Sequence, residues 1–431
     1  MRGASPAGPA KSAWFALAVL IAVSLFSFVD RQIITLAGDP LRRSLNLNDV
    51  QLGAIQGLGL ALFAGLASYP VAWLADRFDR RVVLCGCIIV WSLATAGCGF
   101  ATGFSSMMAC ATLVAIGEAG VVPIIWSTIP DIIAPRHRMR ANFIFFAAAL
   151  LGAAAGLGLG GAALGWLIAN MAKLPAWMAG MEAWRAAMIA VALPGPLFVV
   201  LVAVLRLGKG RAPVDEAGSG AGFLTYARRN WGTLLGIFGS VAAYNVSLGS
   251  TILFIPTALP RLFDITPATI GLQLGGVLAV ATLSGLLCSA LALRFWRGDR
   301  TLAPLRLSQI LFAAAIVPTM FLPFVTAPWQ VFAIAGVELF AAVGAASVLP
   351  GVLQDIAPVH LRGRVIALSS IITALAQGLT PVVIGLISEG IHSPRGLMIG
   401  IGAVALPGWL VAAAAMRSAE KPFWRTLAAP A

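Results

Sequence analysis

Twelve long apolar segments follow one another along the chain, and each is long enough to cross a bilayer as an α-helix. Hydrophobic residues make up 60% of the 431 residues and charged residues only 10%, whereas a soluble domain carries roughly 25% charged residues. The sequence therefore predicts an all-α integral membrane protein with transmembrane helices over residues 13–38, 50–74, 82–103, 106–133, 141–169, 184–205, 231–257, 267–293, 303–324, 328–352, 365–388 and 395–416.

The basic residues predict the orientation of these helices. The net charge is +13, but the Lys and Arg residues lie in short runs between apolar segments and form no nucleic-acid-binding patch. If the N-terminus is cytoplasmic, 22 of the 29 Lys and Arg residues fall on the cytoplasmic side and 6 on the other, as the positive-inside rule requires. We therefore expect both termini in the cytoplasm, and the compact loops favour a bacterial inner membrane.

An internal repeat predicts two pseudo-symmetric six-helix bundles. WLADRF at 73–78 aligns with ALALRF at 290–295, and PDIIAPRHRMRA at 130–141 aligns with QDIAPVHLRGRVIA at 354–367. A Gly-rich, charged segment lies between the two halves. We therefore expect an N-terminal bundle, a cytoplasmic linker, a C-terminal bundle and a cytoplasmic tail, at residues 1–206, 207–230, 231–417 and 418–431. A site between two duplicated bundles is a recurrent plan of transporters.

Charged residues inside the predicted helices are the strongest candidates for a functional site. Asp30 and Arg31 are adjacent in the first helix, Glu118 in the fourth is the only charged residue between Arg81 and Asp131, and Glu338 is alone in the tenth. A charge at that depth is costly and needs a partner or a water-filled cavity. Asp30 and Arg31 either line a cavity or snorkel to the helix end, while each glutamate lines a cavity or forms a structural hydrogen bond.

The loop after the second helix carries WLADRFDRR at 73–81. This segment resembles the signature of the major facilitator superfamily, with Ala72 and Asp79 at the two glycine positions. The resemblance implies the major facilitator fold and a cytoplasmic gate that Asp76, Arg77 and Arg81 help to close. The aligned cytoplasmic helix ends add further gate candidates, namely Asp131, Arg138, Asp355 and Arg362.

Further motifs resemble the Spinster branch of this superfamily: DRQI at 30–33, LNLNDVQLG at 45–53, GEAG at 117–120 and DIAP with RGR in 355–364. The resemblance implies alternating access around a cavity lined by the first, fourth, seventh and tenth helices. It also implies a lysolipid-like or amphipathic anionic substrate. Asp30 and Glu118 would then be the groups that bind protons, and Arg31 would pair with them or with the anionic group of the substrate.

One departure from the superfamily weakens the case for a strongly anionic substrate. An arginine is common seven residues before Glu118, where this chain has Ala111.

The organic anion transporters also use an Asp–Arg pair in the first helix and a Glu in the fourth, so a proton-coupled organic anion transporter is the alternative.

Uncharged polar and aromatic residues complete the set of candidates. Gln56, Trp126, Tyr244, Asn245 and Gln377 line the cavity or hold helices together by hydrogen bonds. The five cysteines and three histidines show no metal-ligand spacing, and no nucleotide-binding or catalytic motif is present. We therefore expect no metal, no cofactor and no enzymatic activity. The expected partners are the bilayer, a small-molecule or lipid substrate and protons, and the expected state is a monomer. A lipid scramblase or a membrane receptor remains the non-transporter alternative.

Overall fold

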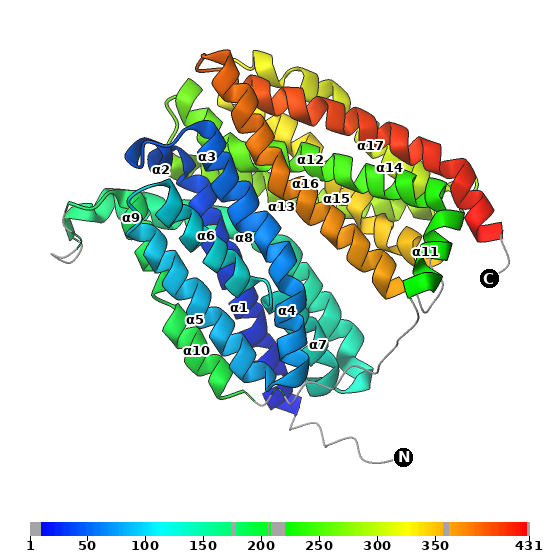
Figure 1. Ribbon diagram of the computed structural model, residues 1–431, viewed down its shortest axis with the longest axis horizontal. Helices are drawn as coiled ribbons and strands as arrows, with labels where there is room; N and C mark the ends of the chain where they lie inside the picture. Colours follow the sequence, from blue (N-terminus) through cyan, green and yellow to red (C-terminus); the bar gives the residue numbers. More distant parts are fainter. Residues whose placement is uncertain are drawn as a thin grey trace. The chain divides into compact units, whose positions relative to one another are not determined.

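The computed structural model describes residues 10–173, 178, 180–205, 207, 220–356 and 362–428. In these residues it contains helices and no strand (Figure 1). Twelve helical spans in the described part are long and apolar enough to cross a membrane, which confirms the predicted all-α integral membrane protein. The α-helices are α1 (Ala10–Leu36), α2 (Gly38–Ser44), α3 (Asp49–Ala54), α4 (Phe63–Arg77), α5 (Arg80–Gly99), α6 (Phe104–Glu118), α7 (Val121–Ile132), α8 (Pro135–Asn170), α9 (Ala183–Ala192), α10 (Gly195–Ala203), α11 (Gly220–Arg229), α12 (Trp231–Leu262), α13 (Pro267–Arg294), α14 (Ala303–Met320), α15 (Pro328–Ile356), α16 (Arg362–Ile391) and α17 (Gly396–Ala428).

Three of the spans are divided between two α-helices where the sequence predicts one continuous helix. The second span consists of α3, a π-helix at Ile55–Leu62 and α4, the fourth of α6 and α7, and the sixth of α9 and α10. The sixth breaks at Leu193–Pro194 and resumes with a second proline, Pro196, near the start of α10. Proline lacks an N–H donor and its ring clashes with the carbonyl group four residues earlier, so it ends the preceding helix.

Contacts divide the chain into two compact units. Unit 1 consists of Met1–Leu47, Leu58–Val214 and Thr266–Gly275, and unit 2 of Asn48–Gly57, Asp215–Ile265 and Gly276–Ala431. Each unit thus includes a short segment from a helix that continues in the other unit: the start of α13 in unit 1, and α3 with the first π-helical residues in unit 2. The predicted division into an N-terminal bundle, linker, C-terminal bundle and tail stays a prediction.

Small residues allow the helices of unit 1 to approach closely. A Cβ atom at Gly156 in α8 would lie 2.7 Å from the carbonyl oxygen of Phe28 in α1. The start of α13 meets α8 in the same way, because a Cβ atom at Gly271 would lie 2.7 Å from the Leu157 carbonyl oxygen. Close backbone approach at small residues is the usual way that helices associate in lipid. The glycine-rich stretch at 152–161 therefore serves helix packing.

In unit 2, α12 and α14 both run along α17 (Figure 1). Phe312 of α14 and Trp409 of α17 are fully buried there, with ring centroids 5.9 Å apart. The short α3 lies against α16, where a Cβ atom at Gly385 would lie 2.6 Å from the Asp49 carbonyl oxygen and one at Gly53 would overlap the Pro381 carbonyl oxygen. The start of the second membrane span is therefore part of the packing of unit 2.

The last helix is longer than the sequence prediction, which ends it at residue 416. α17 continues to Ala428, because Ala419 and Phe423 are buried among apolar residues of unit 2. The Thr426 hydroxyl also bonds to the Thr233 hydroxyl of α12 at 2.8 Å. Part of the predicted linker is helical as well: in α11, the Tyr226 hydroxyl donates to the Ile356 carbonyl oxygen at 2.8 Å.

Candidate transport site

Two helices of unit 1 bring together an arginine and a glutamate inside the membrane. Arg31 lies in α1, and Glu118 is the last residue of α6. The Arg31 Nε atom donates to Glu118 Oε2 at 3.0 Å, and Arg31 Nη2 lies 2.9 Å from the same oxygen. The Glu118 side chain is 1% exposed, whereas the Arg31 side chain is 38% exposed. The carboxylate is therefore sealed from solvent, while its cationic partner is accessible.

The position of Glu118 follows from a break in the fourth membrane span. α6 ends at Glu118, and Pro123 follows early in α7. In a continuous helix, the Pro123 ring would clash with the carbonyl group of Ala119, four residues earlier. A Cβ atom at Gly117 would lie 2.7 Å from the Trp91 backbone nitrogen of α5, so glycine brings this helix end close to its neighbour. A carboxylate at a helix C-terminus is electrostatically unfavourable, and Arg31 compensates for it.

Asp30 has a different partner from its neighbour Arg31. Its side chain is completely buried, and Oδ2 accepts a hydrogen bond from the Thr95 hydroxyl of α5 at 2.7 Å. The two adjacent charged residues of α1 thus bond to two different helices, α5 and α6. Thr95 is a polar contact of the site that the sequence analysis missed. Its signal is weak, because most threonines in membrane helices bond to their own backbone.

Ala111, the position of the common superfamily arginine, is fully buried and supplies no charge. Around Glu118, the described residues therefore show one ion pair, that with Arg31. The assignment of Asp30, Arg31 and Glu118 as a substrate and proton site stays a prediction, now with a defined geometry.

The predicted gate residues of unit 1 have only some of the expected contacts. Asp131, at the end of α7, pairs with Arg80, whose Nη1 lies 2.5 Å from Asp131 Oδ2. Arg81 instead pairs with Asp79 at 2.7 Å, next to the start of its own helix. Asp79 caps α5 by accepting from the Arg81 backbone N–H, which explains an acidic residue at a position where the superfamily has glycine. The sequence analysis did not name Arg80, because it took only Arg77 and Arg81 from the family signature.

The other gate candidates either make contacts within their own segment or have side chains outside the described part of the structure. Arg138 donates to the carbonyl oxygens of Ile133 and Pro130, at 3.2 and 2.6 Å, and Arg77 lies over the Trp73 ring. The side chains of Asp76, Asp355 and Arg362 are outside the described residues. A gating role for this set stays a prediction.

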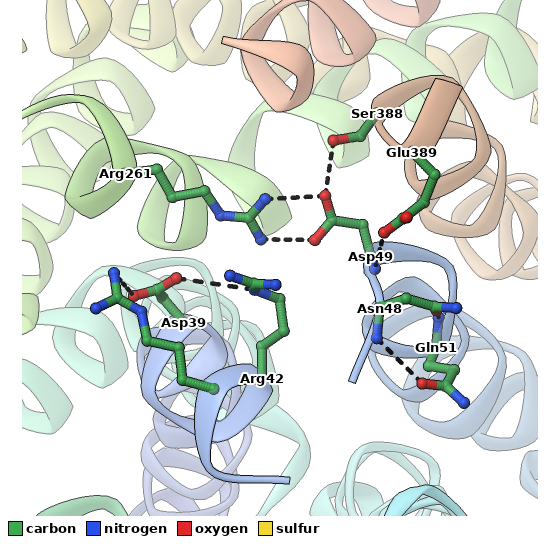
Figure 2. Close-up of polar contacts among 9 residues, drawn as sticks. Asp39, Arg42, Asn48, Asp49, Gln51, Arg261, Ser388 and Glu389 are labelled. Carbon is green, nitrogen blue, oxygen red and sulfur yellow. Dashed lines mark hydrogen bonds and ion pairs between the residues drawn. The ribbon is translucent and has the colours of Figure 1, made fainter. Parts of the chain in front are cut away.

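A second charged cluster, in unit 2, surrounds the start of α3 (Figure 2). Arg261 of α12 donates to both carboxylate oxygens of Asp49, at 2.8 and 2.6 Å, and the Ser388 hydroxyl of α16 donates to Oδ2 at 2.7 Å. The Asp49 backbone N–H donates to Glu389 Oε1 at 2.8 Å, and Asn48 caps the helix. Negative groups are favourable at a helix N-terminus, so α16 and α12 together hold the start of α3.

The uncharged candidates of unit 2 are engaged in contacts between or along helices. Gln377 of α16 donates to Asn245 Oδ1 of α12 at 3.0 Å. The neighbouring Tyr244 stacks on Phe312, with ring centroids 5.4 Å apart. Gln56 is buried, and neither end of its side-chain amide has a hydrogen bond among the described residues. The bond between Gln377 and Asn245 is thus an interhelical hydrogen bond, and a cavity-lining role for these four residues stays a prediction.

Two further candidates differ in their surroundings. In unit 1, Trp126 is 38% exposed and packs edge-on against Phe145, at 5.1 Å between ring centroids. In unit 2, Glu338 is fully buried and bonds to Thr319. Trp126 is thus accessible to a ligand, whereas Glu338 is enclosed by protein.

Outside the membrane spans of unit 1, Glu182 connects the end of α2 to the start of α9. It accepts hydrogen bonds from Ser44, Trp184 and Arg185. Partial burial raises the pKa of Glu182, but these hydrogen bonds together outweigh burial and lower the pKa below its ordinary value.

Comparison with known proteins decides the family. The sequence model described as "Major Facilitator Superfamily" matches residues 20–257, more than half of the chain. The chain belongs to the Major Facilitator Superfamily. The relatives of this superfamily member are transporters, so the chain is a secondary transporter and not an enzyme.

Individual relatives confirm the predicted resemblance to the Spinster branch. A crystal structure of a bacterial homologue of the human lysosomal transporter Spinster superposes with a TM-score of 0.79 at 23% identity, over 98% of this chain and all of that one. Protein spinster homolog 1 of Homo sapiens is 33% identical over 153 residues, which cover 34% of this chain and 28% of that protein. An "MFS-type efflux pump" of Mycolicibacterium smegmatis is 25% identical over 94% of both chains.

Proposed function

We propose that this superfamily member moves a lysolipid-like or other amphipathic anionic solute by alternating access, coupled to protons. It would act as a monomer in a bacterial inner membrane, with both termini in the cytoplasm. Asp30, Arg31 and Glu118 form the proposed site. The observation that carries the proposal is the unequal exposure of the ion pair: Arg31 is 38% exposed and Glu118 is 1% exposed.

This asymmetry supports anion exchange at Arg31. A carboxylate, phosphate or sulfate group of a solute can approach the exposed guanidinium, which binds such groups in a bidentate manner. Glu118 cannot move into water as easily, because its side chain lies inside the protein. A solute anion that recruits Arg31 therefore leaves a buried carboxylate without its cation.

Proton coupling follows from the free-energy cost of a buried carboxylate that has lost its cation. An isolated buried charge is unfavourable, and a carboxyl group in this position avoids the cost by binding a proton. Asp30, buried beside the pair and bonded to Thr95, adds a second acidic group to the site. Binding of a solute anion and binding of a proton are then thermodynamically linked.

The test is flux into proteoliposomes that contain the purified protein, with and without an imposed pH gradient. The solutes are an anionic lysophospholipid, a zwitterionic lysophospholipid and a small organic anion such as nicotinate. The variants are Arg31→Ala, Asp30→Asn and Glu118→Gln, with Arg395→Gln as the matched control. Arg395 is an exposed arginine whose guanidinium donates to the Pro323 carbonyl oxygen.

We expect flux of the anionic lysolipid that responds to the pH gradient. Loss of a charge-assisted hydrogen bond of about 1.5–3 kcal/mol should reduce flux at low solute concentration about tenfold or more in Arg31→Ala, and Arg395→Gln should transport like the parent. Unchanged flux in all three site variants would remove the site from the mechanism. Flux of the organic anion alone would favour an organic anion transporter. Lipid movement without any response to the gradient would indicate a scramblase, and no flux of any of the three solutes would contradict the proposed substrate class.

A further inference from the structure

Glu338 is a fully buried carboxyl group in unit 2, whereas Arg31 and Glu118 belong to unit 1. It lies in α15, and its Oε1 atom is 2.5 Å from the Thr319 hydroxyl oxygen of α14. The Thr251 hydroxyl of α12 and the Trp409 indole of α17 also lie next to the carboxyl group. Four helices of one unit therefore meet at this group.

The described surroundings of Glu338 contain no ion-pair partner. Titratable or charged groups occur on every helix that packs against α15, but none of them is hydrogen-bonded or ion-paired with Glu338; they are Tyr244 and Arg261 on α12, Cys288 and Arg294 on α13, Arg306 on α14, Glu389 on α16, and Arg417, Glu420, Lys421 and Arg425 on α17. An ionised carboxylate enclosed in this way would bear the full cost of losing its hydration.

The Thr319 hydroxyl serves two acceptors, one of which is Glu338. Its hydroxyl oxygen lies 2.7 Å from the Ala315 carbonyl oxygen as well as 2.5 Å from Glu338 Oε1. A threonine hydroxyl has one hydrogen atom, and a carbonyl oxygen has none to donate. Thr319 donates toward both acceptors, so its single hydrogen is shared between them, and an ionised Glu338 would receive only part of one neutral hydrogen bond at Oε1. A protonated carboxyl group avoids the cost of a buried charge and can itself donate to the Thr319 oxygen, which leaves the Thr319 hydrogen to the Ala315 carbonyl oxygen.

We infer that Glu338 is a proton-binding site of unit 2, distinct from the Arg31–Glu118 pair of unit 1. The same surroundings contain a hydrogen-bond donor for the ionised form of Glu338. The Trp409 indole N–H is buried and has no hydrogen bond of standard geometry among the described residues, and neither has Glu338 Oε2. A small shift of α17 would let the indole donate to the carboxylate, while the Thr319 hydroxyl turns from Ala315 to Glu338.

Release of the proton would therefore change contacts between helices. The protonated form bonds α15 to α14 through Thr319, and the ionised form would add a bond to α17 through Trp409. Because Trp409 packs on Phe312 of α14, the change would reach the packed aromatic core of unit 2. This inference does not rest on the proposed substrate or on the role of Arg31.

Infrared difference spectroscopy of the purified full-length protein tests the proton directly, through the C=O stretching band of a protonated carboxylic acid. The parent is compared with Glu338→Gln, and with Glu420→Gln as the matched control, since Glu420 is a partly buried carboxylate paired with Arg306. We expect a carboxylic acid band in the parent at neutral pH that is lost in Glu338→Gln and kept in Glu420→Gln. The band should also remain in the double variant Asp30→Asn/Glu118→Gln, and it should disappear reversibly as the pH is raised.

The inference is overturned if Glu338→Gln has the parent's spectrum in this region, or if the band persists at every pH at which the protein stays folded. Glu338→Gln should fold, because a glutamine amide has the shape of the protonated acid. If it does not fold, Thr319→Val provides the second test. Valine removes the hydroxyl acceptor, so the carboxylic acid band should shift to higher frequency, and an unshifted band would contradict the assigned proton.

Discussion

The Arg31–Glu118 ion pair predicts a specific loss of stability when Arg31 is replaced by glutamine. The Glu118 side chain is 1% exposed, so its carboxylate would stay buried without its cation. Breaking a fully buried pair costs about 3–5 kcal/mol, and leaving a buried acceptor unsatisfied costs about 1–3 kcal/mol. Because Arg31 is 38% exposed and water already screens the pair, we expect a loss of about 2–3 kcal/mol.

A double-mutant cycle separates this effect from general damage. Arg31→Gln, Glu118→Gln and the double variant are compared by denaturant unfolding in detergent. Glu118→Gln should cost less than Arg31→Gln, because it removes the buried charge and leaves an arginine that water can reach. The coupling energy should be about 1–3 kcal/mol.

The Arg306–Glu420 pair is the control for that cycle. The Arg306 side chain is 41% exposed and that of Glu420 is 19% exposed, and Arg306 Nε lies 3.4 Å from Glu420 Oε2. An exposed pair of this kind should couple by less than about 1 kcal/mol. Additive single effects at Arg31 and Glu118, or equal coupling in both pairs, would refute the buried ion pair.

Three further predictions follow from other contacts. Arg261→Lys should cost about 1.5–3 kcal/mol in unfolding free energy, because lysine keeps the charge but not the forked bonds to Asp49; a parent-like variant would contradict this. Gly117→Ala should lose about 1–3 kcal/mol and reduce transport, because its Cβ would press on backbone atoms of α5, whereas Gly86→Ala, with nothing within 4 Å, should do neither. The pKa of Glu182 is lowered in the folded state, so its contribution is present above the unfolded pKa of about 4.3 and is lost as the pH falls through the folded value. The parent should therefore lose thermal stability relative to Glu182→Gln below about pH 4.3, and a constant difference between the two would contradict this.

Much of the fold could be predicted from the sequence because lipid imposes simple rules on length and polarity. Every one of the twelve predicted helices corresponds to a helical span of the described residues. The interruptions were not predicted, because the spans were assigned by hydropathy, which a helix break does not change. The local cue at the fourth span was Pro123, three residues after GEAG. Its effect can be derived from the missing N–H and the ring clash with the Ala119 carbonyl group.

The candidate site could be predicted only in part. A charged residue in an apolar helix stands out in the sequence, so Asp30, Arg31 and Glu118 were found. Their partners are less visible, because Thr95 is one of many small polar residues and its contact with Asp30 depends on how α5 rotates against α1. The partner of Asp131 was missed for a related reason: Arg80 and Arg81 are adjacent, and only the phase of α5 decides which of them turns inward.

Proton uptake on solute binding tests the central claim most directly. The purified protein in weakly buffered detergent solution is mixed with an anionic lysophospholipid, and the change in pH is recorded for the parent, Glu118→Gln and Glu420→Gln. If the solute anion takes Arg31 from Glu118, the parent and Glu420→Gln should take up protons, and Glu118→Gln should take up fewer. Equal uptake in all three proteins, or solute binding without any uptake by the parent, would contradict exchange at the Arg31–Glu118 pair.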